Sequence, residues 1–292
     1  MQECQFICPS TVSEGIETIS RINEDVLFIS GGTDLVIKLQ GGQVKPVWLM
    51  DISLLPELKF IKEDDGRIRI GSGATFAQIS ESDLVREKAR CLSQAASQVG
   101  SAQIRNRATL GGNIANASPA GDSLPALLVL EAWVSVIGPQ GFRRIPFAQL
   151  QAGGDVGLQG KELITEIDFP VREPQGNEQI LSVFGKVGSR TAVSIARLNM
   201  AALLEFDAEN QRILNSRWAV GALGRTPFRL EELEREIQGK RINPVLAQEI
   251  ADHLTGVVDQ AIPGRASQEY KRQAIRGLAY DLLEDLFPLK LG

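Results

Sequence analysis

Short apolar runs, each followed by turn-forming residues, divide the first part of the chain into strands and loops. The pattern predicts strands at residues 26–29, 47–52, 67–70, 142–147 and 163–171. A short helix over residues 34–39 joins the first two of these strands into a small βαβ-type unit. The sequence GPQG at residues 138–141 predicts a hairpin turn after the apolar stretch 127–137. Thr75 and Gln78 have the spacing of a helical capping box, and the helical region that follows, broken near Asp83, extends to about residue 99.

The pattern changes after the polar, turn-rich stretch 173–177, which we interpret as a linker. Strand-like runs follow at residues 182–187, 199–206 and 217–223. Three helices with apolar residues at i, i+3 and i+4 spacing come after them, at residues 230–237, 245–258 and 269–286. In the last helix the predicted buried stripe is Tyr270, Ala274, Leu278, Leu282 and Leu286. Strands followed by helices predict an α+β domain with its helices on one face of an antiparallel sheet.

Composition limits the classes of protein that are possible. The 292 residues are 43% hydrophobic, which is enough for a large core and for two or three domains. A net charge of -5 gives no reason to expect nucleic acid or an anionic membrane as a partner. No apolar run approaches the roughly 20 residues of a membrane-spanning helix. The start, MQECQFICPS, does not have the pattern of a signal peptide.

Cysteine and histidine are scarce. Cys4, Cys8 and Cys91 are an odd number without framework spacing, so we expect reduced thiols in a cytoplasmic protein and no metal site. His253 is the only histidine and lies far along the chain from any candidate nucleophile. We therefore do not expect a Ser-His-Asp or Cys-His mechanism, and we predict no catalytic acid, base or nucleophile.

Two similar glycine loops are the strongest chemical signal in the sequence. They are SGGTD at residues 30–34 and TLGGN at residues 109–113. Adjacent glycines accept positive φ and leave no Cβ in the way, so several backbone N–H groups can point at one anion. Neither loop has Walker A or G-x-G-x-x-G spacing. The residues alone leave two interpretations open: a pair of loops that holds a pyrophosphate, or two ordinary turns.

Asp122 lies ten residues beyond Gly112 and also has two possible roles. Its carboxylate is suited to accept hydrogen bonds from a ribose or ribityl hydroxyl. Alternatively, Asp122 or Ser123 is the N-cap of a helix that has Pro125 in its first turn. The two roles are compatible with each other.

The motifs themselves carry a family resemblance over nearly the whole chain. FISGGTDLVIKL and QIRNRATLGGNIANASPAGDSLPAL resemble the two flavin loops of the FAD-binding medium subunits of molybdenum hydroxylases, of the xanthine dehydrogenase and carbon monoxide dehydrogenase type. RIRIGSGATFAQI, FGKVGSRTAVSIARLNMAALL and SQEYKRQAIRGLAYDLL resemble later signatures of the same family.

The resemblance implies an α+β fold of the vanillyl-alcohol oxidase type, in which two subdomains bind FAD, followed by a smaller α+β C-terminal domain. The expected ranges are 1–55 for the first FAD-binding subdomain, 56–174 for the second and 175–292 for the C-terminal domain.

Carried over position by position, the resemblance also predicts the cofactor site. Asp122 takes an acidic position expected to meet cofactor hydroxyls, and Lys186 matches a lysine near the flavin; the residues alone favour a surface or structural lysine at a strand end. Two departures are Ser30, where many relatives have Ala, and Ala222, where a glycine is common. The predicted FAD-binding residues are Ile29, Ser30, Gly31, Gly32, Thr33, Asp34, Leu35, Val99, Ala102, Ile104, Thr109, Gly111, Gly112, Asn113, Asp122, Ile164 and Lys186.

The family implies an electron-transfer role for the chain. Electrons would come from [2Fe-2S] clusters in a small partner subunit, pass through FAD and leave on NAD⁺, while a large partner subunit carries molybdopterin. No cysteine-rich insertion is present, so no cluster is expected in this chain. Two alternatives remain: a stand-alone flavin oxidase, and a flavin-free scaffold related to this family.

Overall fold

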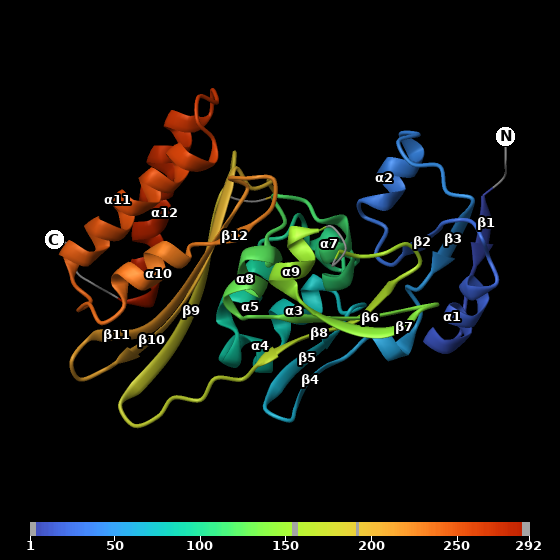
Figure 1. Ribbon diagram of the computed structural model, residues 1–292, viewed down its shortest axis with the longest axis horizontal. Helices are drawn as coiled ribbons and strands as arrows, with labels where there is room; N and C mark the ends of the chain where they lie inside the picture. The colour runs from blue at the N-terminus through green and yellow to red at the C-terminus, as the bar shows by residue number, and fades with distance from the viewer. Residues whose placement is uncertain (1–3, 154–156, 191–192, 288–292) are drawn as a thin grey trace. The chain divides into compact units, whose positions relative to one another are not determined.

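The structure, a computed structural model, describes residues 4–153, 157–190 and 193–287. The chain forms two compact units, and each takes several segments of the sequence (Figure 1). The first unit contains Met1–Ser82, Ser101–Ala117 and Glu131–Pro170, and the second contains Asp83–Gly100, Ser118–Leu130 and Val171–Gly292. These units do not follow consecutive ranges of the sequence, so the three-part division at residues 55 and 174 stays a prediction.

The first unit begins with a small parallel sheet whose strand order is β1-β3-β2. The predicted βαβ unit is confirmed, because β2 and β3 are parallel and α2 lies between them in the chain. Ile19, Val26 and Met50 are among the buried residues that fill its core. The elements are β1 (Gln5–Ile7), α1 (Val12–Ser20), β2 (Val26–Ile29), α2 (Leu35–Gln40), β3 (Trp48–Asp51) and the 3₁₀ turn η1 (Pro56–Leu58).

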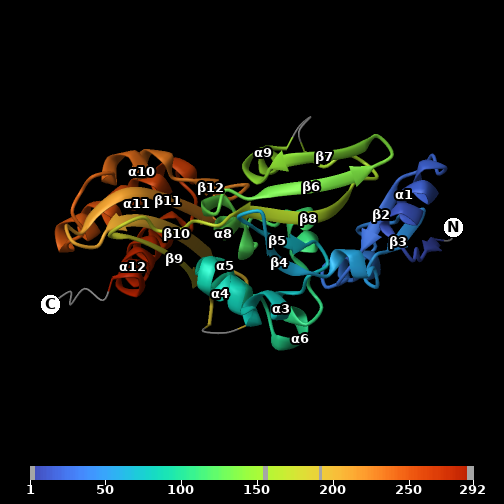
Figure 2. The same cartoon turned by 90° about the horizontal axis from the view of Figure 1, so that it is seen from below.

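An antiparallel sheet of order β4-β5-β8-β6-β7 completes the strands of the first unit (Figure 2). The predicted hairpin is present, with Gly138 paired to Gly141. The capping box is also confirmed: Gln78 N donates to Thr75 Oγ1 at 3.3 Å, and Thr75 N donates to Gln78 Oε1 at 2.9 Å. The elements are β4 (Ile61–Asp64), β5 (Arg67–Gly71), α3 (Phe76–Glu81), α6 (Ala102–Arg105), α7 (Leu110–Asn116), β6 (Trp133–Gly138), β7 (Gly141–Pro146), α9 (Phe147–Ala152) and β8 (Leu163–Pro170).

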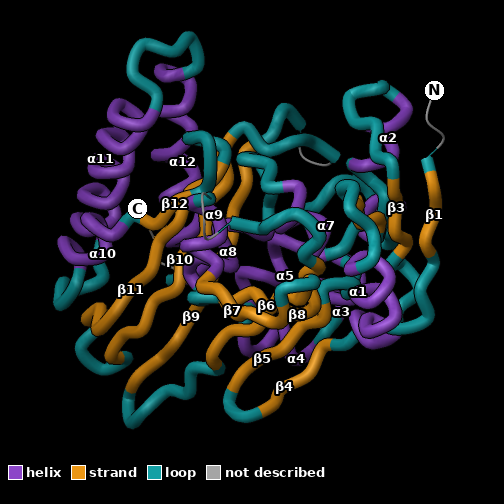
Figure 3. Tube along the Cα trace, turned by 45° about the vertical axis from the view of Figure 1, so that its right-hand side comes forward, coloured by secondary structure: helices purple, strands orange, loops and turns teal. Residues whose placement is uncertain are grey.

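The second unit is built on an antiparallel sheet of order β12-β11-β10-β9. Figure 3 shows these strands in orange and the long C-terminal helices in purple. The predicted strands and helices of the second half are all present, with ends that differ by a few residues. The elements are α4 (Asp83–Lys88), α5 (Arg90–Ser97), α8 (Ser123–Val129), β9 (Glu178–Val187), β10 (Leu198–Asp207), β11 (Arg212–Gly221), β12 (Phe228–Arg229), α10 (Glu231–Ile237), α11 (Pro244–Ala261) and α12 (Gln268–Leu286).

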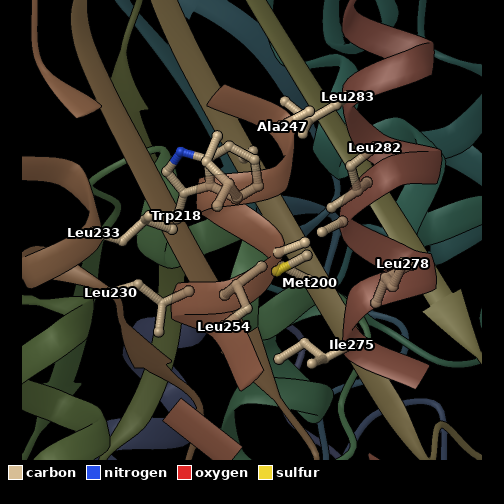
Figure 4. Packing of buried hydrophobic residues seen from close by; sticks show 14 of the residues in the cluster. Met200, Trp218, Leu230, Leu233, Ala247, Leu254, Ile275, Leu278, Leu282 and Leu283 are labelled. Carbon is tan, nitrogen blue, oxygen red and sulfur yellow. The ribbon is translucent and has the colours of Figure 1, made fainter. Parts of the chain in front are cut away.

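The core of the second unit lies between this sheet and helices α10, α11 and α12. Trp218 and Met200 come from the strands and meet Leu254 and Leu278 from the helices (Figure 4). Large apolar side chains of this kind contribute about 1.5–3 kcal/mol each when fully buried. The buried stripe predicted for α12 is right at Leu278, Leu282 and Leu286, but Tyr270 is exposed and Ala274 is only partly buried. Ile275, Ala279 and Leu283 complete the buried face instead.

The prediction that helices cover only one face of this sheet is wrong. Strands β9, β10 and β11 also contact α5 and α8, which belong to earlier segments of the chain. The reason lies in the strands, because β10 is buried along nearly its whole length rather than on alternate residues. A strand that is apolar on both sides needs a cover on both sides. Local sequence order could not show that residues 83–100 and 118–130 supply it.

Candidate functional site

The first glycine loop lies between β2 and α2. Ile29 ends the strand, and Leu35 begins the helix with Asp34 at the N-cap position. Gly32 has φ +75°, a left-handed conformation that favours glycine. Gly31 is needed for a different reason: a Cβ at this position would lie 2.1 Å from the backbone oxygen of Arg107, just before the second loop.

The backbone of the first loop has N–H groups that form no hydrogen bond with a described residue. The N–H groups of Gly31, Gly32 and Thr33 donate no hydrogen bond to any described residue. These residues are half-buried, so the three donors are accessible without being fully solvated. Successive unpaired amides of this kind form an anion-binding concavity, and the residues present therefore fit one phosphate group or more of a nucleotide.

The second glycine loop forms the start of α7 and differs from the first. Thr109 caps the helix by accepting a hydrogen bond from Gly112 N at 3.2 Å. Leu110 N donates to Ala74 O at 3.1 Å, and Gly111 N donates to Ser72 O at 2.9 Å. The expected second cradle of unpaired amides is therefore absent at these positions, because the amides bind the turn after β5. Gly112 is exposed, and a Cβ there would meet only Thr109 Oγ1, at 3.0 Å.

Three contacts join the two loops within the first unit. Gly31 packs against the Arg107 carbonyl, as described above. The hydroxyl groups of Ser30 and Thr109 lie 3.3 Å apart, within hydrogen-bonding distance. Asn116 forms a bridge, since it accepts from Lys38 Nζ at 2.6 Å and donates to Asp34 Oδ1 at 3.1 Å. Segments separated by about eighty residues in the sequence thus become one structural unit.

The second unit holds Asp122 and Lys186, which form a buried ion pair. Lys186 Nζ donates to Asp122 Oδ2 at 2.6 Å, and both side chains are 7% exposed. The ammonium also donates to Gln98 O at 3.1 Å. Asn199, which is fully buried, donates from Nδ2 to the other carboxylate oxygen, Asp122 Oδ1, at 3.1 Å. The Lys186 side chain is therefore buried, so it is not a surface lysine, and the structural role stays open beside the role near the flavin.

This ion pair bears on the capping role considered for Asp122, and the contact of Asp122 with a cofactor stays a prediction. The residue stands at the N-cap position of α8, but its side chain makes no capping hydrogen bond. The predicted N-cap position is therefore confirmed, but the carboxylate does not cap the helix, because Lys186 and Asn199 hold it instead. Burial raises the pKa of Asp122 above its ordinary value, and the Lys186 charge together with both hydrogen bonds opposes that rise.

The remaining predicted residues are divided between the two units. Ala102 and Ile104 lie in α6, and Ile164 is buried in β8, all in the first unit. Val99 lies just after α5, in the second unit. The contacts of these four residues with a cofactor stay predictions.

Comparison with known protein families shows the family of the chain. Residues 2–172 match the model described as the FAD binding domain in molybdopterin dehydrogenase. The chain belongs to this family. Residues 184–286 match a second model, the CO dehydrogenase flavoprotein C-terminal domain. The family resemblance read from the two glycine motifs is confirmed, and so is FAD as the cofactor of this flavoprotein chain.

Individual relatives agree along almost their whole length. The xanthine dehydrogenase FAD-binding subunit of Escherichia coli O157:H7 is 30% identical over 94% of this chain and 93% of the relative. The nicotinate dehydrogenase FAD-subunit of Eubacterium barkeri is 29% identical over 98% of this chain and 97% of the relative. A solved structure of carbon monoxide dehydrogenase from Hydrogenophaga pseudoflava has the same fold, with a TM-score of 0.85, 23% identity and coverage of 97% of this chain and 96% of that one.

Some residues that contact the predicted site residues were not found from the sequence. Arg107, Ser72 and Ala74 act through backbone carbonyl groups, which no side-chain pattern reveals. Asn199 had a signal that could have been used, since it is a single amide at the start of the apolar run MAALL. His253 pairs with Glu236 in the second unit, at 2.8 Å. Among the described residues, no group of three or more His, Cys, Asp or Glu is placed to hold a metal ion, and no helix among them is long and apolar enough to span a membrane.

Proposed function

We propose that this chain is the FAD-binding electron-transfer subunit of a molybdenum hydroxylase complex and that NAD⁺ is its final electron acceptor. In this proposal, electrons arrive from [2Fe-2S] clusters of a small partner subunit, and a large partner subunit carries molybdopterin and the hydroxylated substrate. The names of the two relatives support a subunit role, because each is called a FAD subunit of a dehydrogenase. They name different substrates, xanthine or nicotinate, so we propose no substrate for this chain.

The observation that carries the proposal is the set of unpaired amides at Gly31, Gly32 and Thr33. We assign them to the diphosphate of FAD, with the hydroxyl group of Ser30 as a further donor; the Thr33 hydroxyl has a long contact of 3.4 Å with Asp34 Oδ2 and would have to turn away from it to take part. Backbone donors suit a diphosphate because hydrogen bonds to an ionised acceptor are about twice as strong as those between neutral groups. The second loop contributes mainly its shape, because its own first amides are occupied. Exposed Gly112 lets a ligand approach the α7 backbone closely.

Asp122 and Lys186 have binding and electrostatic roles in this proposal. Asp122 accepts hydrogen bonds from hydroxyl groups of the cofactor. Lys186 has three N–H donors, of which Asp122 and Gln98 take two, and its positive charge favours reduced, anionic flavin. FAD itself accepts electrons singly and releases them as hydride, so the chain needs no acid or base of its own for that step.

The two alternatives make different predictions. A stand-alone flavin oxidase would oxidise an organic substrate with oxygen in the absence of any other subunit. A flavin-free scaffold would be colourless and would not bind added FAD. The unpaired amides of the first loop favour a nucleotide-binding chain over a scaffold.

The test uses the full-length chain and then its complex. The isolated chain should bind FAD in a 1:1 ratio, and affinity purification of the tagged chain from its native host should recover an iron–sulfur subunit and a molybdopterin subunit. Reduction of the FAD in that complex by substrate should then yield NADH from NAD⁺. Failure to bind FAD would end the proposal, and reduction of an artificial acceptor but not of NAD⁺ would replace the acceptor alone.

A further inference from the structure

Asn199 is a polar residue in a place where an apolar one would be expected. It lies in β10 of the second unit and is completely buried. The sheet register sets it opposite Lys186 on β9 and opposite Gly221 on β11. These three residues form a row across the sheet, on the side where Asp122 and Pro125 of the α8 region lie. A buried side-chain amide needs hydrogen-bond partners, and the groups that it binds indicate its role.

The Asn199 side chain has one strong interaction and one atom without any. Its Nδ2 donates to Asp122 Oδ1 at 3.1 Å and has a longer contact of 3.5 Å with Gly121 O. Its Oδ1 is buried without a hydrogen-bond partner among the described residues. Turning the amide over would set Oδ1 against the carboxylate, so the Asp122 charge fixes this orientation. The fold thus tolerates an unsatisfied acceptor in order to keep the donor on Asp122.

Gly221 provides the space that this orientation requires. A Cβ on Gly221 would lie 2.3 Å from Asn199 Oδ1 and 3.1 Å from Pro125 Cγ. Any other residue at position 221 would therefore push the amide away from Asp122. Met200, the residue after Asn199 on β10, points to the opposite side of the sheet and packs among apolar side chains. The need for glycine thus belongs to the Asn199 row and not to the core.

Asp122 is held from two strands at once. Lys186 of β9 occupies one carboxylate oxygen and Asn199 of β10 occupies the other. An ionised carboxylate has about four acceptor sites on its two oxygens. One site on each oxygen is used, so the plane of the group is fixed while acceptor sites remain for a hydroxyl-bearing ligand.

We propose that Asn199 is a positioning residue for FAD: it holds the Asp122 carboxylate in the orientation that accepts hydrogen bonds from the cofactor hydroxyls, and Gly221 gives it the room to do so. This inference rests on the proposed FAD-binding function, and specifically on Asp122 as a ligand of the cofactor. Asn199 acts through Asp122 and needs no contact with FAD itself.

The first experiment separates positioning from packing. Asn199→Leu keeps the branched shape and the number of side-chain heavy atoms, although its methyl groups need more room; it cannot donate, and it also removes the unsatisfied acceptor. We expect the variant to remain folded, as a cooperative urea transition would show, while its Kd for FAD rises roughly tenfold, the size expected for a lost hydrogen bond to a charged group. The midpoint potential of the bound flavin should also shift. Asn215→Leu is the matched control, because Asn215 also donates to a carboxylate in this sheet, Glu205 Oε2 at 3.2 Å.

The second experiment uses the pairing of Asn199 with Gly221. Gly221→Ala should lower both stability and FAD affinity. The double variant Asn199→Ala/Gly221→Ala should regain much of the stability, because the 2.3 Å contact is gone, but it should not regain FAD affinity. Wild-type affinity in Asn199→Leu, or recovery of FAD binding in the double variant, would overturn the inference. A wild-type chain that bound no FAD would instead show that the proposed function has failed.

Discussion

Replacing Gly112 by alanine should separate cofactor binding from folding. The new Cβ would meet only Thr109 Oγ1, at 3.0 Å, and the residue is an exposed position within α7 with no positive φ. Alanine gains about 0.5–1 kcal/mol over glycine inside a helix, and the close Thr109 contact offsets part of this gain. We therefore expect the free energy of unfolding of the apo chain to change by less than about 1 kcal/mol.

FAD binding should respond far more strongly to the same methyl group. If the diphosphate approaches the α7 backbone at Gly112, the methyl group displaces it by about the length of one C–C bond and weakens charge-assisted hydrogen bonds. Loss of one such bond corresponds to about 1.5–3 kcal/mol, or roughly a 10- to 150-fold rise in Kd. Flavin fluorescence titration of the apo chain measures Kd, and urea unfolding measures stability.

Two other glycines serve as references for this prediction. Gly31→Ala would place a Cβ 2.1 Å from Arg107 O, which is backbone and cannot move aside, so it should cost about 1–3 kcal/mol of stability as well as FAD affinity. Gly256 lies in α11, and a Cβ added there would have no atom within 4 Å, so Gly256→Ala should lower neither the stability nor the FAD affinity. If Gly112→Ala bound FAD with wild-type affinity while Gly31→Ala bound it more weakly, the assignment of the second loop to the cofactor would be refuted.

Three further predictions follow from individual side chains. Ala222 has φ +56°, which is unfavourable for alanine, so Ala222→Gly should raise stability by about 1 kcal/mol and raise the Tm; a lower Tm would contradict this. Lys186→Met leaves its buried carboxylate partner without a counter-charge and should cost about 3–5 kcal/mol of stability. Burial already raises the pKa of the Asp122 carboxyl group in the folded chain, and loss of the ammonium raises this pKa further. The free energy of unfolding therefore falls as the pH rises above the pKa of the unfolded chain, and the stability lost in the variant should be larger at about pH 8 than at about pH 5. A stability loss that did not depend on pH would refute this reasoning. The same variant should still bind FAD, with a lower affinity because Asp122 loses one of its two partners, and with a shifted midpoint potential; an unchanged potential would remove the electrostatic role of Lys186. Burial raises the pKa of Cys91 to about 12, so in the native chain a thiol reagent should react quickly with exposed Cys4 and Cys8 and slowly with Cys91; equal rates for all three would show that Cys91 is accessible.

The sequence by itself determined the local structure and the family. Hydrophobic periodicity located the long helices and most of the strands to within a few residues, because both patterns arise from the chain's own repeat, but it did not predict the short strands β1, β4 and β12. The capping box at Thr75 and Gln78 is likewise a local interaction, complete within one helical turn. The two glycine motifs identified the family through their resemblance to the flavin loops of its members, whereas the residues alone left a pyrophosphate cradle and two ordinary turns open.

Only the tertiary structure decided how the pieces combine. Gly31 is required by the carbonyl of Arg107, and the amides of the second loop are taken by carbonyls of residues 72 and 74, which no side-chain pattern could indicate. The cover of the C-terminal sheet by α5 and α8, and the partners of Asp122 on β9 and β10, depend on contacts between residues distant in sequence. A single sequence records the preferences of each segment, whereas such pairings depend on burial and hydrogen bonding that exist only after the chain has folded.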